Sequence, residues 1–509
     1  MLFNGRILSN EQKATVGLFR DMGPQETLVI DAGAGAAKTF TSNAIVSLCT
    51  KNENVLVLVY NNIIAKKMAD EFPSNVLVST SHAYARSMLP AYSSTRLERP
   101  LTKKAVISVL KLPMSIIGLS ANQFASMLLQ TLSDYAISDE NCIETYVEQL
   151  GHTDAITLQL VHYTKLLWDE MTDRHSTLPV MHDVYLKEFV LKVVTGQLAL
   201  NLDVLVLDEA QDSAPVVKQF FDYVKAKKIS VGDKFQSIYE WRGAINVMQT
   251  LISAGHKTAR LTTCYRYGQE IAELSNDLIE QYYNENPEFK GNANKSSVIY
   301  SDNLSHVKHE QELHIFRTNT SLMASVMDYY SQGQKCLVLK GTKEQLMLLN
   351  DAERLFNGQR VMHGTFSAFD SWNEFIDYVN TQGGSLKNLY RAIQSYGFKL
   401  MKTVLEQSQH HTIDNAGKVF TTAHACKGIE HDHVVLADDF DSIFCKSKNN
   451  ERLQEVNLLY VALTRAIKTL DISRCDTLRN LYLKKHSVAT PLNNDMMENK
   501  KAALMALFA

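Results

Sequence analysis

The chain has 509 residues, of which 45% are hydrophobic and 21% are charged, and its formal net charge is −3. This composition is typical of a globular protein with room for roughly three or four domains. The seven cysteines form no CxxC pair, which argues against a zinc ribbon, an iron–sulfur cluster and a disulfide framework. No apolar run approaches about 18 residues and the first residues lack the features of a secretory signal, so we expect a cytoplasmic protein without a membrane partner.

The first informative element is the segment LVIDAGAGAAKT, residues 28–39. Its apolar beginning predicts a buried strand, and the glycine-containing turn that follows leads into a helix. Such a turn directs several backbone N–H groups and the positive end of the helix at one point, which suits a phosphate group. Lys38 is then expected to reach the β- and γ-phosphates of ATP, and the Thr39 hydroxyl to bind Mg²⁺. The backbone of this cradle is formed by Gly33, Ala34, Gly35, Ala36 and Ala37.

This phosphate loop departs from the usual pattern at two positions. Ala37 stands where a glycine normally precedes the lysine, and Ala32 occupies the first glycine position. If Ala37 holds a negative φ the cradle is unaffected, whereas a positive φ would strain it by about 1–2 kcal/mol. An ordinary strand-to-helix turn and an ATP-binding module without turnover therefore both stay open for this segment.

A second part of the same site is predicted further along the chain. Residues 201–212, NLDVLVLDEAQD, form an apolar run that ends in adjacent acids. Stability alone rarely places carboxylates at the end of a buried strand, because an uncompensated buried charge is costly. Asp208 is expected to hold Mg²⁺, and Glu209 to polarise the attacking water. Together the two segments predict hydrolysis of Mg-ATP.

With DEAQD in place, the chain resembles the superfamily 1 helicases of the UvrD/Rep type nearly end to end. The segments that carry this resemblance follow in the order of that family: residues 55–68, 79–85, 231–244 (VGDKFQSIYEWRGA), 261–268, 421–436 and 455–466. Three further segments are similar to the F-box DNA helicase branch of the family: residues 60–85, 179–189 and 314–323. The motor motifs begin almost at the first residue, so we expect no F-box and do not transfer the ubiquitin-ligase role of that branch.

The resemblance implies further contacts to ATP. Gln12 would read the adenine, Tyr265 would stack on it, and Glu430 would reach the ribose. Arg266 and Arg465 would act as arginine fingers from a second domain, so that hydrolysis depends on closure of a cleft. With Gln236 as a sensor of the γ-phosphate, the expected catalytic residues are Lys38, Asp208, Glu209, Gln236, Arg266 and Arg465.

The resemblance also implies a path for single-stranded DNA. Trp241 would stack on a base, because the chain has only three tryptophans and this one lies in the motif that couples ATP to movement. Weaker candidates for contact with DNA are Tyr60, Asn61, His82, Tyr84 and His424. The two histidines lack Cys or His neighbours at a zinc-ligand spacing. Phe235 and Tyr239 are interpreted as packing residues.

Strand-then-helix alternation around each motif predicts an α/β fold with parallel sheets. By resemblance, we expect two RecA-like parallel-sheet motor domains, each with a mostly helical inserted subdomain. The expected boundaries are residues 1–94 and 192–260 for the first RecA-like domain (1A), 95–191 for its helical insertion (1B), 261–342 and 419–480 for the second RecA-like domain (2A), 343–418 for a small accessory insertion (2B), and 481–509 for a C-terminal tail.

The predicted function is an ATP-dependent DNA helicase that moves 3′ to 5′ along single-stranded DNA and unwinds duplex DNA. The alternative is a translocase that shares every motif but strips proteins such as recombinase filaments from DNA with little unwinding. An RNA helicase is less favoured, because DEAQD together with QSIYEWRGA resembles the DNA-acting branch. Expected partners are single-stranded and tailed duplex DNA, and single-strand-binding or recombinase proteins; the chain is expected to be monomeric. A bacterial protein would associate with the nucleoid and a viral one would act in the host cytoplasm, in DNA repair, recombination or replication.

Overall fold

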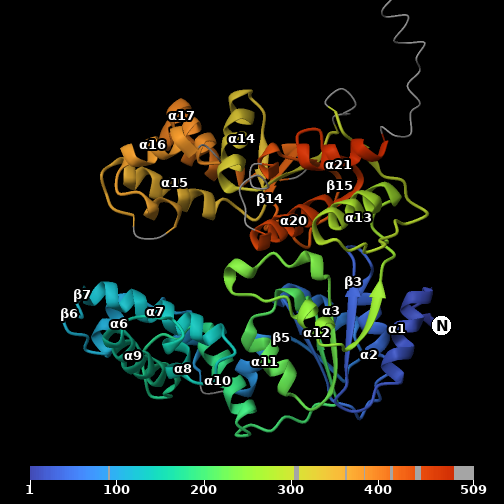
Figure 1. Cartoon of the computed structure of the whole chain (residues 1–509), viewed down its shortest axis with the longest axis horizontal. Coiled ribbons are helices and arrows are strands. Elements are labelled where there is room, and N and C mark those ends of the chain that lie inside the picture. The colour runs from blue at the N-terminus through green and yellow to red at the C-terminus, as the bar shows by residue number, and fades with distance from the viewer. Residues whose placement is uncertain are drawn as a thin grey trace, which may run out of the picture. The chain divides into compact units, whose positions relative to one another are not determined.

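The computed structural model describes residues 1–89, 92–302, 309–361, 364–382, 385–412, 416–441 and 449–486. The chain divides into two compact units, Met1–Leu261 (unit 1) and Thr262–Ala509 (unit 2) (Figure 1). Most of the expected C-terminal tail, residues 487–509, lies outside the described residues. Within the described part of the chain, no helix is both long enough and apolar enough to span a bilayer.

Unit 1 is built on a six-stranded parallel sheet with strand order β10-β3-β9-β8-β4-β5. Its strands are β3 (Thr27–Ala32), β4 (Val55–Val59), β5 (Val76–Thr80), β8 (Val204–Leu207), β9 (Lys227–Gly232) and β10 (Lys257–Leu261). The helices that follow the strands are α2 (Lys38–Val46), α3 (Asn62–Glu71), α4 (Ser81–Met88), α11 (Pro215–Tyr223) and α12 (Val247–Ser253), and α1 (Asn10–Arg20) precedes β3.

The central strands of this sheet are buried on both faces. Leu56 and Leu58 of β4 belong to one apolar cluster, which includes residues of α11 and α12. Val55 and Val57 of the same strand belong to another cluster, which includes residues of α1 and α2. This alternation explains why the strand reads as a continuous apolar run, as is typical of parallel sheets covered by helices on both sides.

The inserted segment of unit 1 is mostly helical, as predicted. It contains α5 (Ser94–Glu98), α6 (Lys103–Val109), α7 (Ala121–Ile137), α8 (Ile143–Glu148), α9 (Asp154–Thr172) and α10 (His182–Val194). It also contains a small antiparallel hairpin that the sequence pattern does not predict, formed by β6 (Ser115–Ile116) and β7 (Leu119–Ser120).

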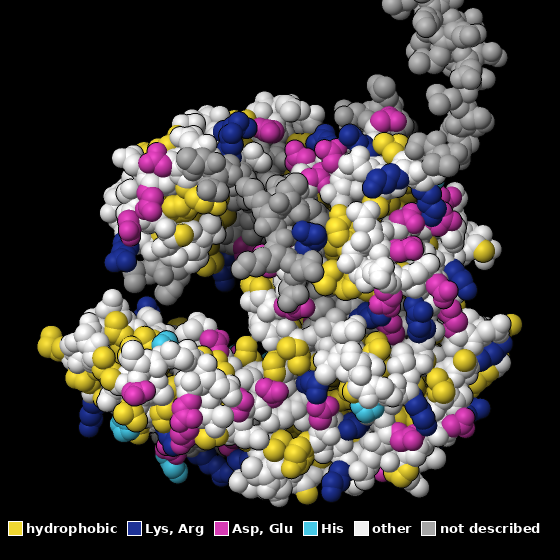
Figure 2. Space-filling model, viewed as in Figure 1, with side chains coloured by type: hydrophobic (Ala, Val, Ile, Leu, Met, Phe, Trp, Pro, Cys, Tyr) yellow, Lys and Arg dark blue, Asp and Glu magenta, His cyan; other side chains and the backbone are white. Residues whose placement is uncertain are grey.

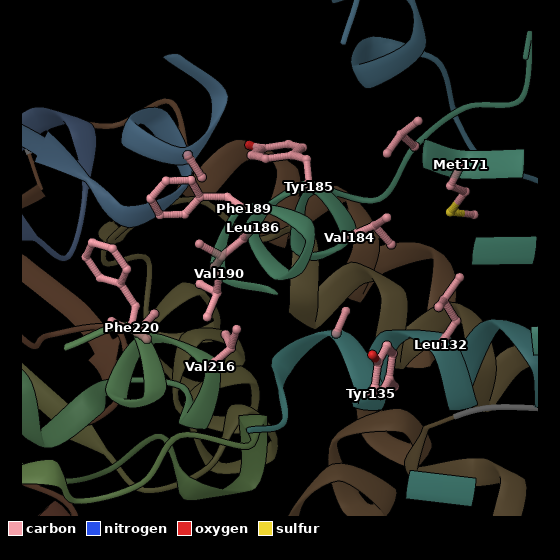
Figure 3. Packing of buried hydrophobic residues seen from close by; sticks show 14 of the residues in the cluster. Leu132, Tyr135, Met171, Val184, Tyr185, Leu186, Phe189, Val190, Val216 and Phe220 are labelled. Carbon is pink, nitrogen blue, oxygen red and sulfur yellow. The ribbon is translucent and has the colours of Figure 1, made fainter. Parts of the chain in front are cut away.

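The insertion and the sheet share one hydrophobic core. Figure 3 shows Phe189 and Val190 of α10 near Phe220 and Val216 of α11, with Tyr135 of α7 nearby. The same cluster reaches Leu56 and Leu58 of the sheet. The insertion is therefore packed against the sheet as part of one core.

Unit 2 repeats the architecture with a second six-stranded parallel sheet, in the order β11-β16-β15-β12-β14-β13. Its strands are β11 (Val298–Tyr300), β12 (Glu312–Phe316), β13 (Cys336–Val338), β14 (Lys418–Thr422), β15 (His431–Leu436) and β16 (Ala466–Asp471). Its main helices are α13 (Gln269–Tyr283), α14 (Asn319–Ser331), α20 (Asn449–Leu463) and α21 (Asp476–His486), and the accessory insertion holds α15 (Lys343–Phe356), α16 (Trp372–Gln382) and α17 (Ser385–Ser408). Two RecA-like domains of α/β class, each with a mostly helical insertion, are confirmed.

Candidate nucleotide and nucleic-acid sites

The phosphate loop lies between the end of β3 and the start of α2. Gly33 N donates to Leu261 O at 3.0 Å and Ala36 N donates to Gly33 O at 3.1 Å, so the turn is tied to β10 and to itself. Ala37, the residue before Lys38, has φ 59° and ψ 44°. Ala37 therefore has the positive φ that was expected to strain the loop, and not the negative φ that would leave it unaffected. This left-handed conformation costs an alanine about 1–2 kcal/mol.

Acidic residues lie at the end of the neighbouring strand β8. Asp208 N donates to Leu58 O at 2.9 Å, which fixes the backbone, and the Asp208 side chain is buried. Burial, followed by the charge of Glu209, raises the pKa of Asp208 to about 7, while Lys38 opposes the shift. Lys38 Nζ lies 3.5 Å from Glu209 Oε1, so the phosphate loop and the acidic strand end are joined by an ion pair.

The donor set of this site suits a divalent cation. Among the described residues, Asp208 Oδ1 is buried without a hydrogen-bond partner. A buried carboxylate oxygen is costly unless something neutralises it. Thr39 follows Lys38 at the start of α2, so a hydroxyl and a carboxylate are available, and hard oxygen donors are what Mg²⁺ prefers. The residues therefore fit Mg²⁺ bound together with a nucleotide.

Gln211 joins the acidic strand end to the next strand, a role that the sequence does not predict. Its Nε2 donates to Glu209 Oε2, and its Oε1 accepts from Asp233 N at 3.2 Å. A Cβ at Gly232 would lie only 2.2 Å from Gln211 Oε1, so a larger residue there would displace the Gln211 side chain. Gln236 belongs to the same buried network, since its Nε2 donates to Asp233 Oδ2 at 2.7 Å. The predicted γ-phosphate sensor is thus linked to the predicted base through side-chain and backbone hydrogen bonds.

Gln12 is buried and already bonded inside unit 1. Its Oε1 accepts from Ser9 N at 3.0 Å in a capping box at the start of α1, and its Nε2 donates to Thr41 Oγ1 at 3.2 Å. The side chain therefore connects α1 to the helix of the phosphate loop. A contact between Gln12 and adenine stays a prediction.

In unit 2, the two predicted arginine fingers lie together. Arg266 pairs with Glu430 at 2.5 Å and donates through Nη1 to Thr464 O at 2.7 Å. Arg465 is buried, and its Nε donates to Val461 O at 2.8 Å. Burial, and after it the charge of Arg266, lowers the pKa of Arg465. Glu430, predicted to reach a ribose, here neutralises Arg266.

The other residues of unit 2 that are predicted to bind ligands are less constrained. The Tyr265 side chain is 41% exposed, as an adenine platform requires. His424 lies in the turn after β14 and is partly buried. Their roles stay predictions.

An exposed aromatic group forms the best candidate surface for single-stranded nucleic acid. Trp241 is 61% exposed, and the Arg242 guanidinium lies 4.5 Å from the centre of its ring. The rings of Tyr60 and Tyr239 are stacked, with centroids 5.8 Å apart and planes at 10°. Tyr239, expected to be a packing residue only, therefore pairs with a predicted DNA contact. Asn61 Oδ1 accepts from Ile64 N at 2.9 Å and caps α3.

Tyr84 is the one predicted DNA contact whose placement argues against the role. Its ring is 6% exposed and packs edge-on against Phe189, next to Phe220. A ring inside the core has no free face for a base, so we correct this prediction. His82, two residues earlier on α4, is partly exposed, and its Nε2 lies 2.9 Å from Asp183 Oδ1.

Comparison with known proteins identifies the family. The family model described as UvrD/REP helicase N-terminal domain matches residues 8–257, and the one described as UvrD-like helicase C-terminal domain matches residues 208–477. The chain therefore belongs to the UvrD-like helicase family, as the motifs predicted.

Two relatives are F-box DNA helicases, the branch that the sequence resembles. F-box DNA helicase protein 1 of Schizosaccharomyces pombe is 28% identical over 522 residues, covering 94% of this chain and 58% of that protein. F-box DNA helicase 1 of Gallus gallus is 26% identical over 522 residues, covering 92% of this chain and 49% of that protein. The chain thus spans about half the length of the curated relatives it matches.

Proposed function

We propose that the protein is a DNA helicase that hydrolyses Mg-ATP and moves 3′ to 5′ along single-stranded DNA. The observation that carries the proposal is the ion pair between Lys38 and Glu209 beside the unpartnered buried oxygen of Asp208, in a chain of the UvrD-like helicase family. These groups are the ones that phosphoryl transfer to water requires: a cation for the phosphates, a metal ligand and a base.

The ion pair suggests how nucleotide binding would prepare the site. In the structure, the Lys38 ammonium neutralises Glu209, which weakens that carboxylate as a proton acceptor. A bound triphosphate competes for the ammonium with a larger negative charge. Lys38 would then turn to the phosphates, and Glu209 would be free to accept a proton from the attacking water. Mg²⁺, held by Thr39 and Asp208, would supply charge neutralisation at the phosphates.

The remaining residues are assigned by the same proposal. Arg266 and Arg465 of unit 2 would stabilise the charge that develops on the γ-phosphate, an effect typically worth about 10³–10⁵ in rate. Gln12, Tyr265 and Glu430 would bind the nucleoside. Trp241 would stack on a base of the strand that is being moved, which contributes about 1–3 kcal/mol per base.

The decisive experiment measures phosphate release with and without single-stranded DNA, followed by unwinding of duplexes with a 3′ or a 5′ tail. Strong stimulation by DNA with preference for the 3′ tail is the expected result. Stimulation without strand separation would favour the translocase that strips proteins from DNA, and equal stimulation by RNA would contradict the assignment of DNA as substrate.

Glu209→Gln tests the assignment of the base. Because proton transfer by a positioned group contributes about 10²–10⁴-fold, hydrolysis should fall by at least about 100-fold while nucleotide binding is retained. Glu240→Gln is a matched control on the exposed turn of unit 1 that precedes Trp241. Near-normal turnover in Glu209→Gln would show that another group acts as the base.

A further inference from the structure

The turn that carries the exposed tryptophan of unit 1 is bonded at both of its ends to the residues that follow β8. On one side, Ile238 N donates to Asp212 Oδ1 at 3.4 Å. On the other side, Ile245 N donates to Ser213 O at 2.8 Å. Between these bonds lie residues 239–244, here called the platform turn, with an exposed tip. The two bonds fix where this turn begins and ends, and the direction of its tip depends on further contacts.

A side chain of the helical insertion lies directly against the platform turn. Gly243 has φ 82° and ψ 10°, and a Cβ built on it would lie 2.5 Å from Ile137 Cδ1. Carbon atoms do not approach that closely, so the isoleucine fills the space that a side chain at residue 243 would take. Ile137 is the last residue of α7. The insertion therefore contacts the backbone of the platform turn two residues after Trp241.

Exposure alone does not distinguish Ile137 from its neighbours. Its side chain is partly exposed. At the place where Figure 1 labels α6 to α9, Figure 2 shows hydrophobic side chains at several points of the surface. Scattered apolar side chains of this kind are normal on a folded protein. The distinguishing feature of Ile137 is its close contact with a backbone glycine of a turn that belongs to the sheet domain.

A buried lysine holds the end of α7 in place. Lys187 of α10 is fully buried, and its Nζ donates to the carbonyl oxygen of Ser138, the residue after Ile137, at 2.8 Å. The ammonium also lies 4.9 Å from the centre of the Tyr135 ring. A cation at the carboxyl end of a helix is favourable, because it meets the negative end of the helix dipole. The position of Ile137 is thus set by the packing of α10 on α7.

We propose that Ile137 is a positioning residue for Trp241, so that the helical insertion sets how firmly the motor holds single-stranded DNA at this point. The indole is 61% exposed. Stacking contributes most when the ring is oriented before the base arrives, because a turn that must be ordered on binding loses entropy. The Ile137 side chain would limit the directions that the platform turn can take. The proposal rests on the proposed function, since it takes Trp241 as the stacking residue.

The test is a double-mutant cycle of Ile137→Ala and Trp241→Ala in the full chain. Affinity for a single-stranded oligonucleotide is measured by fluorescence anisotropy without ATP. In Ile137→Ala the affinity should be about fivefold lower, because part of the benefit of stacking is lost. In the Trp241→Ala background, Ile137→Ala should have no further effect, because the two residues act through the same contact with DNA.

The matched control is Ile156→Ala on α9, which shortens another partly buried isoleucine of the same insertion. Both isoleucine variants should lose similar stability in urea, and only Ile137→Ala should bind the oligonucleotide less tightly. An affinity loss of the same size in Ile156→Ala would overturn the proposal, because general loosening of the insertion would then explain it.

Two further outcomes separate this proposal from the proposed function. If Trp241→Ala weakens binding and Ile137→Ala does not, or if Ile137→Ala weakens it equally in the Trp241→Ala background, the positioning role alone is overturned. If Trp241→Ala binds as tightly as the wild type, the stacking residue of the proposed function is wrong, and the positioning role fails with it. Because ATP is absent, a failure of hydrolysis would contradict the proposed function without affecting these measurements.

Discussion

Ala37 is the residue at which the phosphate loop carries most backbone strain. Its φ of 59° is a conformation that glycine adopts freely and alanine does not. Ala37→Gly should therefore raise the free energy of unfolding of unit 1 by about 1 kcal/mol, because the relief of strain exceeds the extra entropy that glycine has in the unfolded chain. Urea unfolding checks this.

Ala36→Gly is the matched control for that change. Ala36 lies in the same loop and is not among the residues with positive φ. Glycine gains nothing there and adds freedom to the unfolded chain, so this variant should be less stable than the wild type by about 0.5–1 kcal/mol. If both variants shift stability in the same direction, the strain at Ala37 is not the cause.

Asp208 makes the nucleotide-free protein sensitive to pH. Its pKa is about 7 in the folded chain, against 3.8 for an ordinary aspartate, because the charged form is buried. Between about pH 4 and pH 7 the folded state keeps a proton that the unfolded state has lost, so stability falls as the pH rises through this window. Asp208→Asn removes this cost and should stabilise the protein at pH 7 by up to about 4 kcal/mol, while hydrolysis is lost.

Urea titrations at about pH 4.5 and about pH 7 measure the effect. The gain from Asp208→Asn should be large at the higher pH and small at the lower one, where the wild-type carboxyl already holds its proton. Asp222→Asn changes an exposed carboxylate that pairs with Lys218 on α11 and serves as the control. A gain of the same size at both pH values would contradict the assigned pKa shift.

Single residues also show where prediction from sequence stops. Lys38, Asp208 and Glu209 are predictable because each lies at a fixed offset from the end of an apolar run. The environments of Tyr84 and Gln211 are not predictable, because the direction of a side chain on a short helix or turn depends on which neighbours it packs against. The Gln211 side chain lies directly against Gly232, and that proximity joins two strand ends that are distant in the sequence.

At the level of elements, the helical insertion depends on one buried arginine. The guanidinium of Arg96 donates to the backbone carbonyls of residues 170, 171, 173 and 178, at distances from 2.7 to 3.1 Å. Three of these carbonyls lie at the C-terminal end of α9, where the helix has no partners of its own. Arg96→Met should lower the free energy of unfolding by about 2–4 kcal/mol, because several buried acceptors lose their donor.

Arg99→Met is the control for Arg96, since Arg99 lies three residues further on and is exposed. It should change stability by less than about 0.5 kcal/mol. Equal losses in the two variants, measured by urea unfolding, would indicate that the charge of the segment matters and the carbonyl contacts do not.

The elements themselves differ in how well the sequence predicts them. The parallel strands are predictable because both of their faces are buried, so they read as runs such as VLVLV in β4. The β6–β7 hairpin escapes prediction because its strands have two residues each and its turn contains Ile117 where a hairpin signal would need Asn or Asp. Short elements carry too few residues for a periodic pattern.

At the level of the whole chain, two units repeat one plan with different insertions. In unit 2, the accessory helices share a cluster with the sheet: Leu349 of α15, Phe375 of α16 and Leu405 of α17 are buried with Phe420 of β14. The number and order of the domains follow from the motifs, since most motifs lie at the end of a strand. The motifs do not predict that an insertion and a sheet share one hydrophobic core, because this depends on which faces of the helices pack together.

The shared core of unit 1 limits how this protein could be shortened or recombined. A chain that lacked the insertion would uncover the faces of α4 and α11 against which α10 packs, including Tyr84 and Phe220. A contiguous apolar surface of this kind promotes aggregation. The insertion can therefore be exchanged between relatives only together with the residues of α4 and α11 that it covers, so we expect functional chimaeras to carry both from the same parent.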